Sequence, residues 1–92
     1  MTIDFDTIVA ANPDCPVRQV GPGLVIMDPA GTATHSLDEV GAFLWNLLDG
    51  RHSLGQLVDA LVATYEVEPA QATTDVQDFL AQLVAADLVR PA

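Results

Sequence analysis

The residues best suited to chemistry lie in two short stretches, and in each of them a serine follows a histidine. His35 and Ser36 come shortly before Asp38, and His52 comes directly before Ser53. A hydrolytic site needs a nucleophile, a base and an orienting carboxylate that converge in space, whereas neighbours on a strand end or helix start point in different directions. Ser53 is also a typical helix N-cap residue. We therefore predict that the chain is not an enzyme.

Metal and cofactor binding also lack support in the sequence. Cys15 is the single cysteine, and it has neither the second cysteine nor the paired histidines that a zinc site requires. The aspartates lack the spacing of a calcium-binding loop. No glycine-rich motif of the kinds that bind nucleotide phosphates is present. We expect no metal and no cofactor, and we expect Cys15 to be an ordinary thiol in a turn.

Composition limits the partners that the chain can bind. Its 92 residues are 50% hydrophobic, which suits one small folded domain. The 13 acidic residues outnumber the 3 basic ones and give a net charge of -10, so nucleic-acid phosphates should repel the chain. No apolar run reaches the roughly 18 residues that span a membrane, and the N-terminus lacks the features of a signal peptide. We expect a cytoplasmic protein that binds neither nucleic acid nor membrane and prefers neutral or basic partners.

The first third of the chain predicts β-structure behind an N-terminal arm. Residues 1–16 combine scattered apolar positions with two prolines, which indicates an irregular arm with one short helical turn. Short β-prone runs separated by glycine and proline turns predict strands at 17–20, 24–28 and 32–36. Because the turns are short, we expect an antiparallel meander with the third strand at an edge of the sheet. The folded domain is thus predicted to be residues 17–92.

Beyond the third strand, helical spacing predicts helices at 39–49, 54–65 and 69–86, with a last short strand at 88–90. Asp38 is a suitable N-cap, and Gly50 stands where a left-handed residue should end the first helix. Ser53 and Gln56 have the spacing of a capping box. Pro69 suits the first turn of the third helix. The third helix has an unusually wide apolar face, made of Ala72, Val76, Phe79, Leu80, Leu83 and Val84.

These elements predict an α+β domain of the winged helix-turn-helix type, in which a three-stranded antiparallel sheet packs on three helices. Winged-helix domains often bind DNA, but the third helix has no arginine or lysine for phosphate contacts. An acidic chain with a serine at a helix start is also similar to an acyl or peptidyl carrier protein. Ser36 and Ser53, however, follow histidine where carriers have aspartate. DNA binding and a carrier role remain the alternatives.

Three stretches carry a family likeness: "LDEVGAFLWNLLDG" (37–50), "YEV" (65–67) and "FLAQLVAADLV" (79–89). In this order and spacing they resemble the PqqD-like family, the recognition elements for ribosomally synthesised, post-translationally modified peptides (RiPPs), over residues 17–90. The resemblance implies a winged-helix-like fold without DNA binding. Its members bind the leader segment of a precursor peptide and present it to a modifying enzyme, such as a radical SAM protein or a leader peptidase. Asp87 replaces the glycine that the family often has after the third helix, where a left-handed backbone suits glycine better.

In that family the leader adds as an extra strand to the third strand and rests against the third helix. The resemblance therefore implies a peptide site made of Thr32, Ala33, Thr34, His35 and Ser36 on the strand, and of Val76, Phe79, Leu80 and Leu83 on the helix. An edge strand offers unpaired backbone groups to such a peptide. The apolar face of the helix is wider than packing requires, so part of it should serve the partner. The edge could instead join a second copy, so that either a monomer or a strand-exchanged homodimer is expected.

Overall fold

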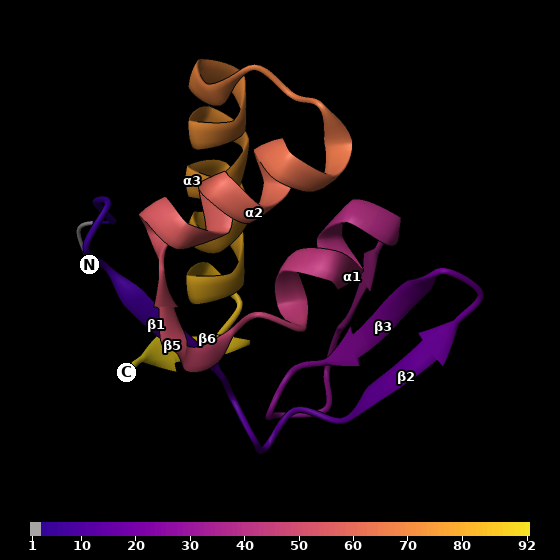
Figure 1. The fold of residues 1–92 in the computed structure, drawn as a ribbon. Helices are drawn as coiled ribbons and strands as arrows, with labels where there is room; N and C mark the ends of the chain where they lie inside the picture. The colour runs from indigo at the N-terminus through magenta and orange to yellow at the C-terminus, as the bar shows by residue number, and fades with distance from the viewer. Residues whose placement is uncertain (1–2) are drawn as a thin grey trace.

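The computed structural model describes residues 3–92, and within them it contains two three-stranded antiparallel sheets and three helices. The strands are β1 (Ile8–Ala11), β2 (Val17–Val20), β3 (Gly23–Met27), β4 (Thr34–Leu37), β5 (Asp49–Ser53) and β6 (Val89–Pro91). The helices are α1 (Glu39–Trp45), α2 (Leu54–Tyr65) and α3 (Pro69–Ala85). In Figure 1, α1 lies between the β2–β3 hairpin and the pair α2 and α3, and both chain ends lie near β1 and β6. The predicted α+β class with three helices is confirmed.

The predicted meander is present as the sheet β2-β3-β4, with the apolar strand β3 in the centre. The third strand begins at Thr34, so the predicted start at Thr32 is wrong by two residues. The carboxylate of Asp28 explains the difference, because it accepts hydrogen bonds from the backbone N–H and from the hydroxyl of Thr32, both at 2.8 Å. These bonds hold Thr32 in the turn between β3 and β4. Strand β4 lies at an edge of the sheet, as predicted.

The sequence analysis does not predict the second sheet, in the order β5-β1-β6, although the last strand that it predicts at 88–90 lies within one residue of β6. Its central strand β1 lies within the segment predicted to be an arm, and it pairs with β5 and β6 from distant parts of the chain. The first helix ends at Trp45 and not at Asp49; residues 46–48 follow it as a turn, the carbonyl of Leu48 accepts the N–H of Ala11 in β1, and Asp49 begins β5. Long-range pairing with β1 thus overrides the local helical period. Gly50 has the expected positive φ of 81°, but it lies inside β5.

The other two helices agree with the predictions. Helix α2 begins with a capping box, in which the Ser53 hydroxyl accepts the N–H of Gln56 and the Gln56 side chain accepts the N–H of Ser53. Helix α3 has Pro69 in its first turn. Two residues that follow helices are left-handed without being glycine, namely Glu66 with φ 53° and Asp87 with φ 60°. The backbone at Asp87 therefore has the left-handed conformation that glycine adopts most readily after a helix.

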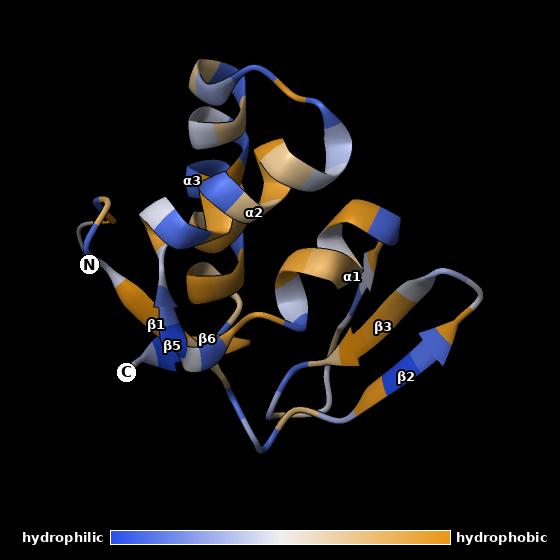
Figure 2. Cartoon of the chain, viewed as in Figure 1, coloured by the Kyte–Doolittle hydropathy of each residue, from blue (hydrophilic) through white to orange (hydrophobic). Residues whose placement is uncertain are grey.

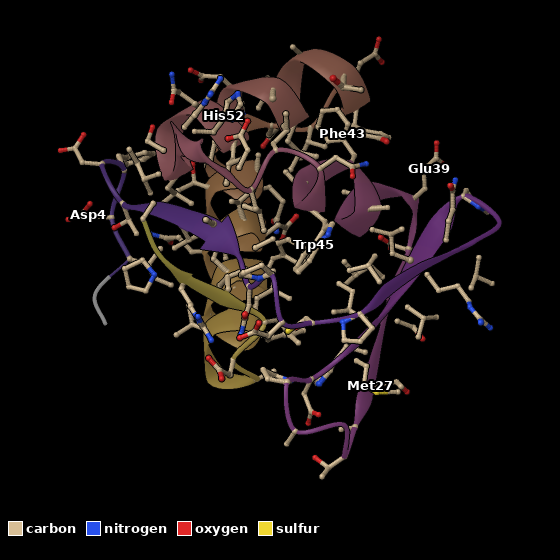
Figure 3. The ribbon with its side chains drawn as sticks, turned by 90° about the horizontal axis from the view of Figure 1, so that it is seen from below. Asp4, Met27, Glu39, Phe43, Trp45 and His52 are labelled. Atoms are coloured by element: carbon tan, nitrogen blue, oxygen red, sulfur yellow. The ribbon has the colours of Figure 1, made fainter. Side chains whose placement is uncertain are left out.

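One hydrophobic core joins the helices to both sheets. Trp45 points into the interior, as Figure 3 shows from below, and its side chain is buried, with 7% exposed. In Figure 2 the apolar colour runs along β3, whereas β2 carries polar residues in its middle. The side chains with no exposed surface come from β3, from α2 and α3 and from the residue before β6: Ile26, Leu54, Leu57, Ala72, Val76, Leu80 and Leu88. Burial of each large side chain stabilises the folded state by roughly 1.5 to 3 kcal/mol.

Within residues 3–92, no helix is long and apolar enough to span a bilayer.

A buried asparagine ties β1 to the end of α3. Asn12 is 2% exposed; its Nδ2 donates to the carbonyl of Asp87 at 2.9 Å, and its Oδ1 accepts the N–H of Asp14 at 3.0 Å. The Asn12 N–H donates to the carbonyl of Leu88 at 2.9 Å. Cys15 is buried beside this joint, and burial raises the pKa of its thiol, which favours the protonated form.

Candidate functional site

Strand β4 leaves one of its edges open. The N–H of Asp28 donates to the carbonyl of Ala33 at 3.0 Å. This bond identifies which residue pairs of the β3–β4 ladder are hydrogen-bonded and which are not. Because bonded and non-bonded pairs alternate in an antiparallel ladder, His35 directs its backbone groups to β3, while Thr34 and Ser36 direct theirs to the open edge. No strand of residues 3–92 pairs with that edge. The edge can therefore accept one more strand.

A groove of about 500 Å³ lies beside the end of β4. Helices α1 and α2 form its floor, β4 forms one wall, and α3 with the segment before it forms the other wall. The lining residues are Ser36, Leu37, Asp38, Val40, Gly41, Leu44, Leu61, Tyr65, Val67, Asp75, Phe79 and Gln82. Since side chains alternate along a strand, a strand added to β4 would direct every second side chain toward this groove.

Helix α3 has two faces with different tasks. Asp75, Phe79 and Gln82 recur at helical spacing and line the groove. The other α3 residues predicted for the peptide site belong to the core and are at most 4% exposed: Val76, Leu80 and Leu83. Phe79 is thus the one predicted α3 residue that reaches the groove, and the buried residues support its wall from behind.

A glycine sets the depth of the groove. A Cβ atom at Gly41 would lie 3.1 Å from the Cβ of Leu37 and 3.5 Å from the Cε1 of Phe79. The same glycine donates its N–H to Asp38, at 2.8 Å, so the predicted N-cap of α1 is confirmed. The Cβ atom of a larger residue would be crowded by Leu37 at the end of β4, whereas its distance to the Phe79 ring would be an ordinary contact. Gly41 therefore permits the close approach of β4, α1 and α3.

The segment between α2 and α3 closes one end of the groove. The ring of Tyr65 packs edge-on against Phe43, with centroids 5.4 Å apart and an interplanar angle of 79°. Glu66 then adopts its left-handed conformation and reverses the chain, so that both Tyr65 and Val67 line the groove. A left-handed non-glycine residue costs roughly 1 kcal/mol, which the surrounding packing must offset. The "YEV" motif is thus part of the groove wall.

The predicted strand residues fall into three groups. Thr32 and Ala33 precede β4, and both are exposed in the turn. His35 is half-buried on the inner face of the sheet. Thr34 and Ser36 are exposed and carry the open edge, and Ser36 also lines the groove.

The outer face of the same sheet has a second hollow, of about 460 Å³. Its lining is largely apolar and consists of Pro16, Val17, Arg18, Val25, Met27 and Thr34. Figure 3 shows Met27 at the periphery of the molecule, where its side chain is 38% exposed. This hollow lies on the side of the sheet that faces away from α1.

The sequence analysis missed the groove residues from the end of β4, from α1 and α2 and from the segment after α2, and also the polar members of α3. The missed residues are Leu37, Asp38, Val40, Gly41, Leu44, Leu61, Tyr65, Val67, Asp75 and Gln82. A signal for the α3 members was present, because Asp75 and Gln82 lie one helical turn on either side of Phe79. The remaining residues meet only through the packing of α1 and α2.

The groove is acidic, and the three arginines lie outside its lining. The groove lining contains Asp38 and Asp75 and no basic residue. The three arginines, Arg18, Arg51 and Arg90, lie on β2, β5 and β6. Because α3 has no basic residue and the arginines are spread over separate strands, no described surface combines the cations that a phosphate backbone needs.

The residues considered for catalysis have structural roles. The Ser53 hydroxyl caps α2. His52 Nδ1 lies 2.9 Å from Asp49 Oδ1 on the surface of β5, and this hydrogen bond lowers the pKa of Asp49. Among residues 3–92, no cluster of histidine, cysteine and acidic side chains is suited to hold a metal ion.

Solved structures with the same fold include proteins in complex with peptides. "TbiB1 in Complex with the TbiA(beta) Leader Peptide" is 25% identical, with a TM-score of 0.79 over 88% of this chain and 94% of that chain. "Lasso peptide synthetase B1 complexed with the leader peptide" is 24% identical, with a TM-score of 0.78 over 90% of this chain and 98% of that one. No curated protein matches the sequence significantly.

A third similar structure is the solution structure of the PqqD truncation of Methylobacterium extorquens PqqCD, described as a stand-alone RiPP recognition element. It is 22% identical, with a TM-score of 0.78 over 97% of this chain and 95% of that chain. The family model of coenzyme PQQ synthesis protein D (PqqD) matches residues 23–89, which is most of the chain. The resemblance noted in the sequence is thereby confirmed, and this chain belongs to the PqqD family.

Proposed function

We propose that this chain is a non-catalytic adaptor of the cytoplasm. It binds the leader segment of a ribosomally synthesised precursor peptide by strand addition along β4. It then presents the peptide to a modifying enzyme, such as a radical SAM protein or a leader peptidase. The observation that carries this proposal is the open edge of Thr34 and Ser36 beside an apolar groove that α3 closes on the far side.

Strand addition at this edge would combine two kinds of interaction. Backbone hydrogen bonds from Thr34 and Ser36 would supply affinity for any extended peptide. Side chains on every second residue of the peptide would enter the groove against Phe79, and these contacts would supply specificity. The groove thus suits an extended peptide.

Two of the similar structures support the proposal, because they are complexes with leader peptides. The arrangement of the charges also favours a peptide over DNA, since the groove holds Asp38 and Asp75 and no cation. A carrier role has less support, because Ser53 uses its hydroxyl in the capping box and Ser36 lies on a strand.

The proposal is tested by closing the edge with a proline. In Thr34→Pro the backbone donor at the open edge is lost, while the bonds of β4 to β3 remain. We expect leader affinity, measured by isothermal titration calorimetry, to fall at least about tenfold, or roughly 1.4 kcal/mol. The peptides to titrate are those encoded beside the gene.

The matched control is Gln19→Pro, on the opposite edge of the same sheet. Gln19 lies between the ladder-bonded residues of β2, so its N–H also points to solvent. We expect this variant to bind the leader like the natural chain, and both variants to keep the helical signal in circular dichroism. Equal losses in the two variants, or no binding by the natural chain below about 100 μM (roughly -5.5 kcal/mol), would argue against strand addition at β4. A dimer that dissociates as peptide is added would indicate that a second copy uses the same edge.

A further inference from the structure

The groove lining contains two carboxylates, and each accepts one hydrogen bond. On α3, Gln71 Nε2 donates to Asp75 Oδ1 at 2.8 Å. At the end of β4, the N–H of Gly41 donates to Asp38 Oδ1 at 2.8 Å. The second oxygen of each carboxylate accepts no hydrogen bond from residues 3–92 in the structure. Each carboxylate therefore has one oxygen still available as an acceptor.

Apolar side chains fill the space between the two carboxylates. Leu37 on the β4 side and Phe79 on the α3 side are both partly exposed, and Tyr65 and Val67 close the end of the groove. These residues would bury an apolar side chain from a peptide. An acidic side chain there would meet the two carboxylates with no cation nearby, which is unfavourable.

The spacing of these groups on α3 matches the spacing of side chains on a strand. Asp75 and Phe79 are four residues apart, which corresponds to about 6 Å along a helix. Residues i and i+2 of a strand point to the same face and lie about 6.8 Å apart. A strand that runs along α3 can thus place one side chain against Phe79 and its second neighbour against Asp75.

We propose that the docking segment of the leader carries a large apolar residue and, two positions away, a lysine or arginine. The apolar side chain occupies the space beside Phe79, and the cation pairs with the free oxygen of Asp75. Asp38 adds to the negative potential from the opposite wall. This inference rests on the proposed function and names the class of peptide that the same site selects.

The test uses a display library of random peptides of about ten residues, long enough for a strand of average length. The library is selected on the natural chain and on Asp75→Lys. We expect peptides bound by the natural chain to be enriched in pairs of an apolar and a basic residue at a spacing of two. The same synthetic peptides should bind Asp75→Lys about tenfold more weakly, and replacement of their basic residue by glutamate should restore affinity for that variant.

Asp59→Lys is the matched control, because Asp59 is an exposed aspartate of α2 outside the groove lining, and the change in net charge is the same. We expect it to bind the selected peptides nearly as the natural chain does. Should Asp75→Lys fold poorly, Asp75→Asn, which removes only the charge, should weaken binding in the same direction.

The outcomes separate this inference from the proposed function. Peptides that lose affinity with Thr34→Pro but show no basic residue and no response to Asp75→Lys would overturn the inference and leave the function intact. Equal responses of Asp59→Lys and Asp75→Lys would also overturn it. A library that yields no binding peptide would contradict both.

Discussion

The two sheets of this small domain treat their edges in opposite ways. The sheet β5-β1-β6 has β6 at one edge, a strand of 3 residues that ends in Pro91, and β5 at the other, with Asp49 and Arg51. The pairing of β1 with β5 is also irregular between Ile8 and Ala10. Short strands, proline, charges and bulges are the features by which proteins prevent unwanted strand pairing. We call this sheet the closed sheet.

The sheet β2-β3-β4, the open sheet, lacks these features at β4. The strand "THSL" has no charged residue and no proline, and it pairs with β3 in regular register from Thr34 to Leu37. Its free edge adjoins an apolar groove. Within the described residues, therefore, one sheet carries features that disfavour an added strand at its edges, and β4 of the other sheet does not. This difference supports the proposal that the open edge of β4 is the one that binds the peptide.

The largest effect is expected from a change that displaces β4 from the open sheet. A Cβ atom at Gly23 would overlap the backbone carbonyl oxygen of Leu37, and a backbone atom cannot turn aside as a side chain can. We expect Gly23→Ala to lower the free energy of unfolding by about 1 to 3 kcal/mol. Peptide affinity should also fall at least about tenfold, since the edge moves with β4. Chemical denaturation followed by circular dichroism and calorimetry measure the two effects.

Gly55→Ala is the control for this substitution. A Cβ atom at Gly55 would meet only Phe5, at an ordinary distance of 3.5 Å, and alanine favours the helix by up to about 1 kcal/mol. Its stability should stay equal or rise, with unchanged affinity. Gly23→Ala with natural stability and natural affinity would mean that β4 can move without harm to the site.

A smaller effect is expected from the closed sheet, and it should change stability alone. Asn12→Ala removes the hydrogen bonds to the carbonyl of Asp87 and from the N–H of Asp14. The loss of buried partners should cost about 1 to 2 kcal/mol of unfolding free energy. Because the substitution leaves the open sheet and the groove residues unchanged, peptide affinity should remain within about twofold of that of the natural chain.

Asn46→Ala is the control, at an exposed asparagine after α1. This substitution should change stability by less than about 0.5 kcal/mol. A tenfold loss of affinity in Asn12→Ala would show that the two sheets are coupled.

The open sheet could be predicted from the sequence, and the closed sheet could not. The open sheet consists of consecutive strands joined by short turns, so local patterns and turn residues suffice to place it. In the closed sheet, β1 receives partners from residues 49–53 and 89–91, and nothing local to "IVAA" indicates them. For the same reason the first helix was predicted to be too long. The missing information was which distant segments pair.

The groove could be predicted in part, through the family resemblance. The order of the strands predicts that the third strand of the meander lies at an edge. The wide apolar face of α3 predicts that Phe79 lines the groove. The division of that face could not be predicted, because Phe79 and Leu80 are adjacent, yet only Leu80 is fully buried. Which neighbour faces the core depends on the angle between α3 and α2, and helix spacing alone does not fix this angle.

The smallest predicted effect concerns the turn that positions the open edge. The pKa of Asp28 lies below its ordinary value of 3.8, chiefly because its carboxylate accepts the backbone N–H of Thr32 and also the hydroxyl of that residue. A group with a lowered pKa in the folded state stabilises the fold above the ordinary pKa, and this contribution is lost as the pH falls through the folded-state value. We therefore expect the turn to loosen only below about pH 3.8. The carboxyl carbon of Asp28 and the N–H of Thr32 should titrate together in NMR spectra with a midpoint below that value.

Asp28→Asn tests the cause of this titration and its consequence for the edge. The amide side chain keeps one acceptor oxygen but does not titrate, so the acid-induced shift of the Thr32 N–H should disappear. In the natural chain the N–H groups of Thr34 and Ser36 should follow the same midpoint, because the turn holds the start of β4. If instead Asp28 titrates at or above 3.8, or the edge N–H groups do not respond, the turn does not control the edge. The open edge would then be held by its pairing with β3 alone, and peptide binding would be independent of the turn.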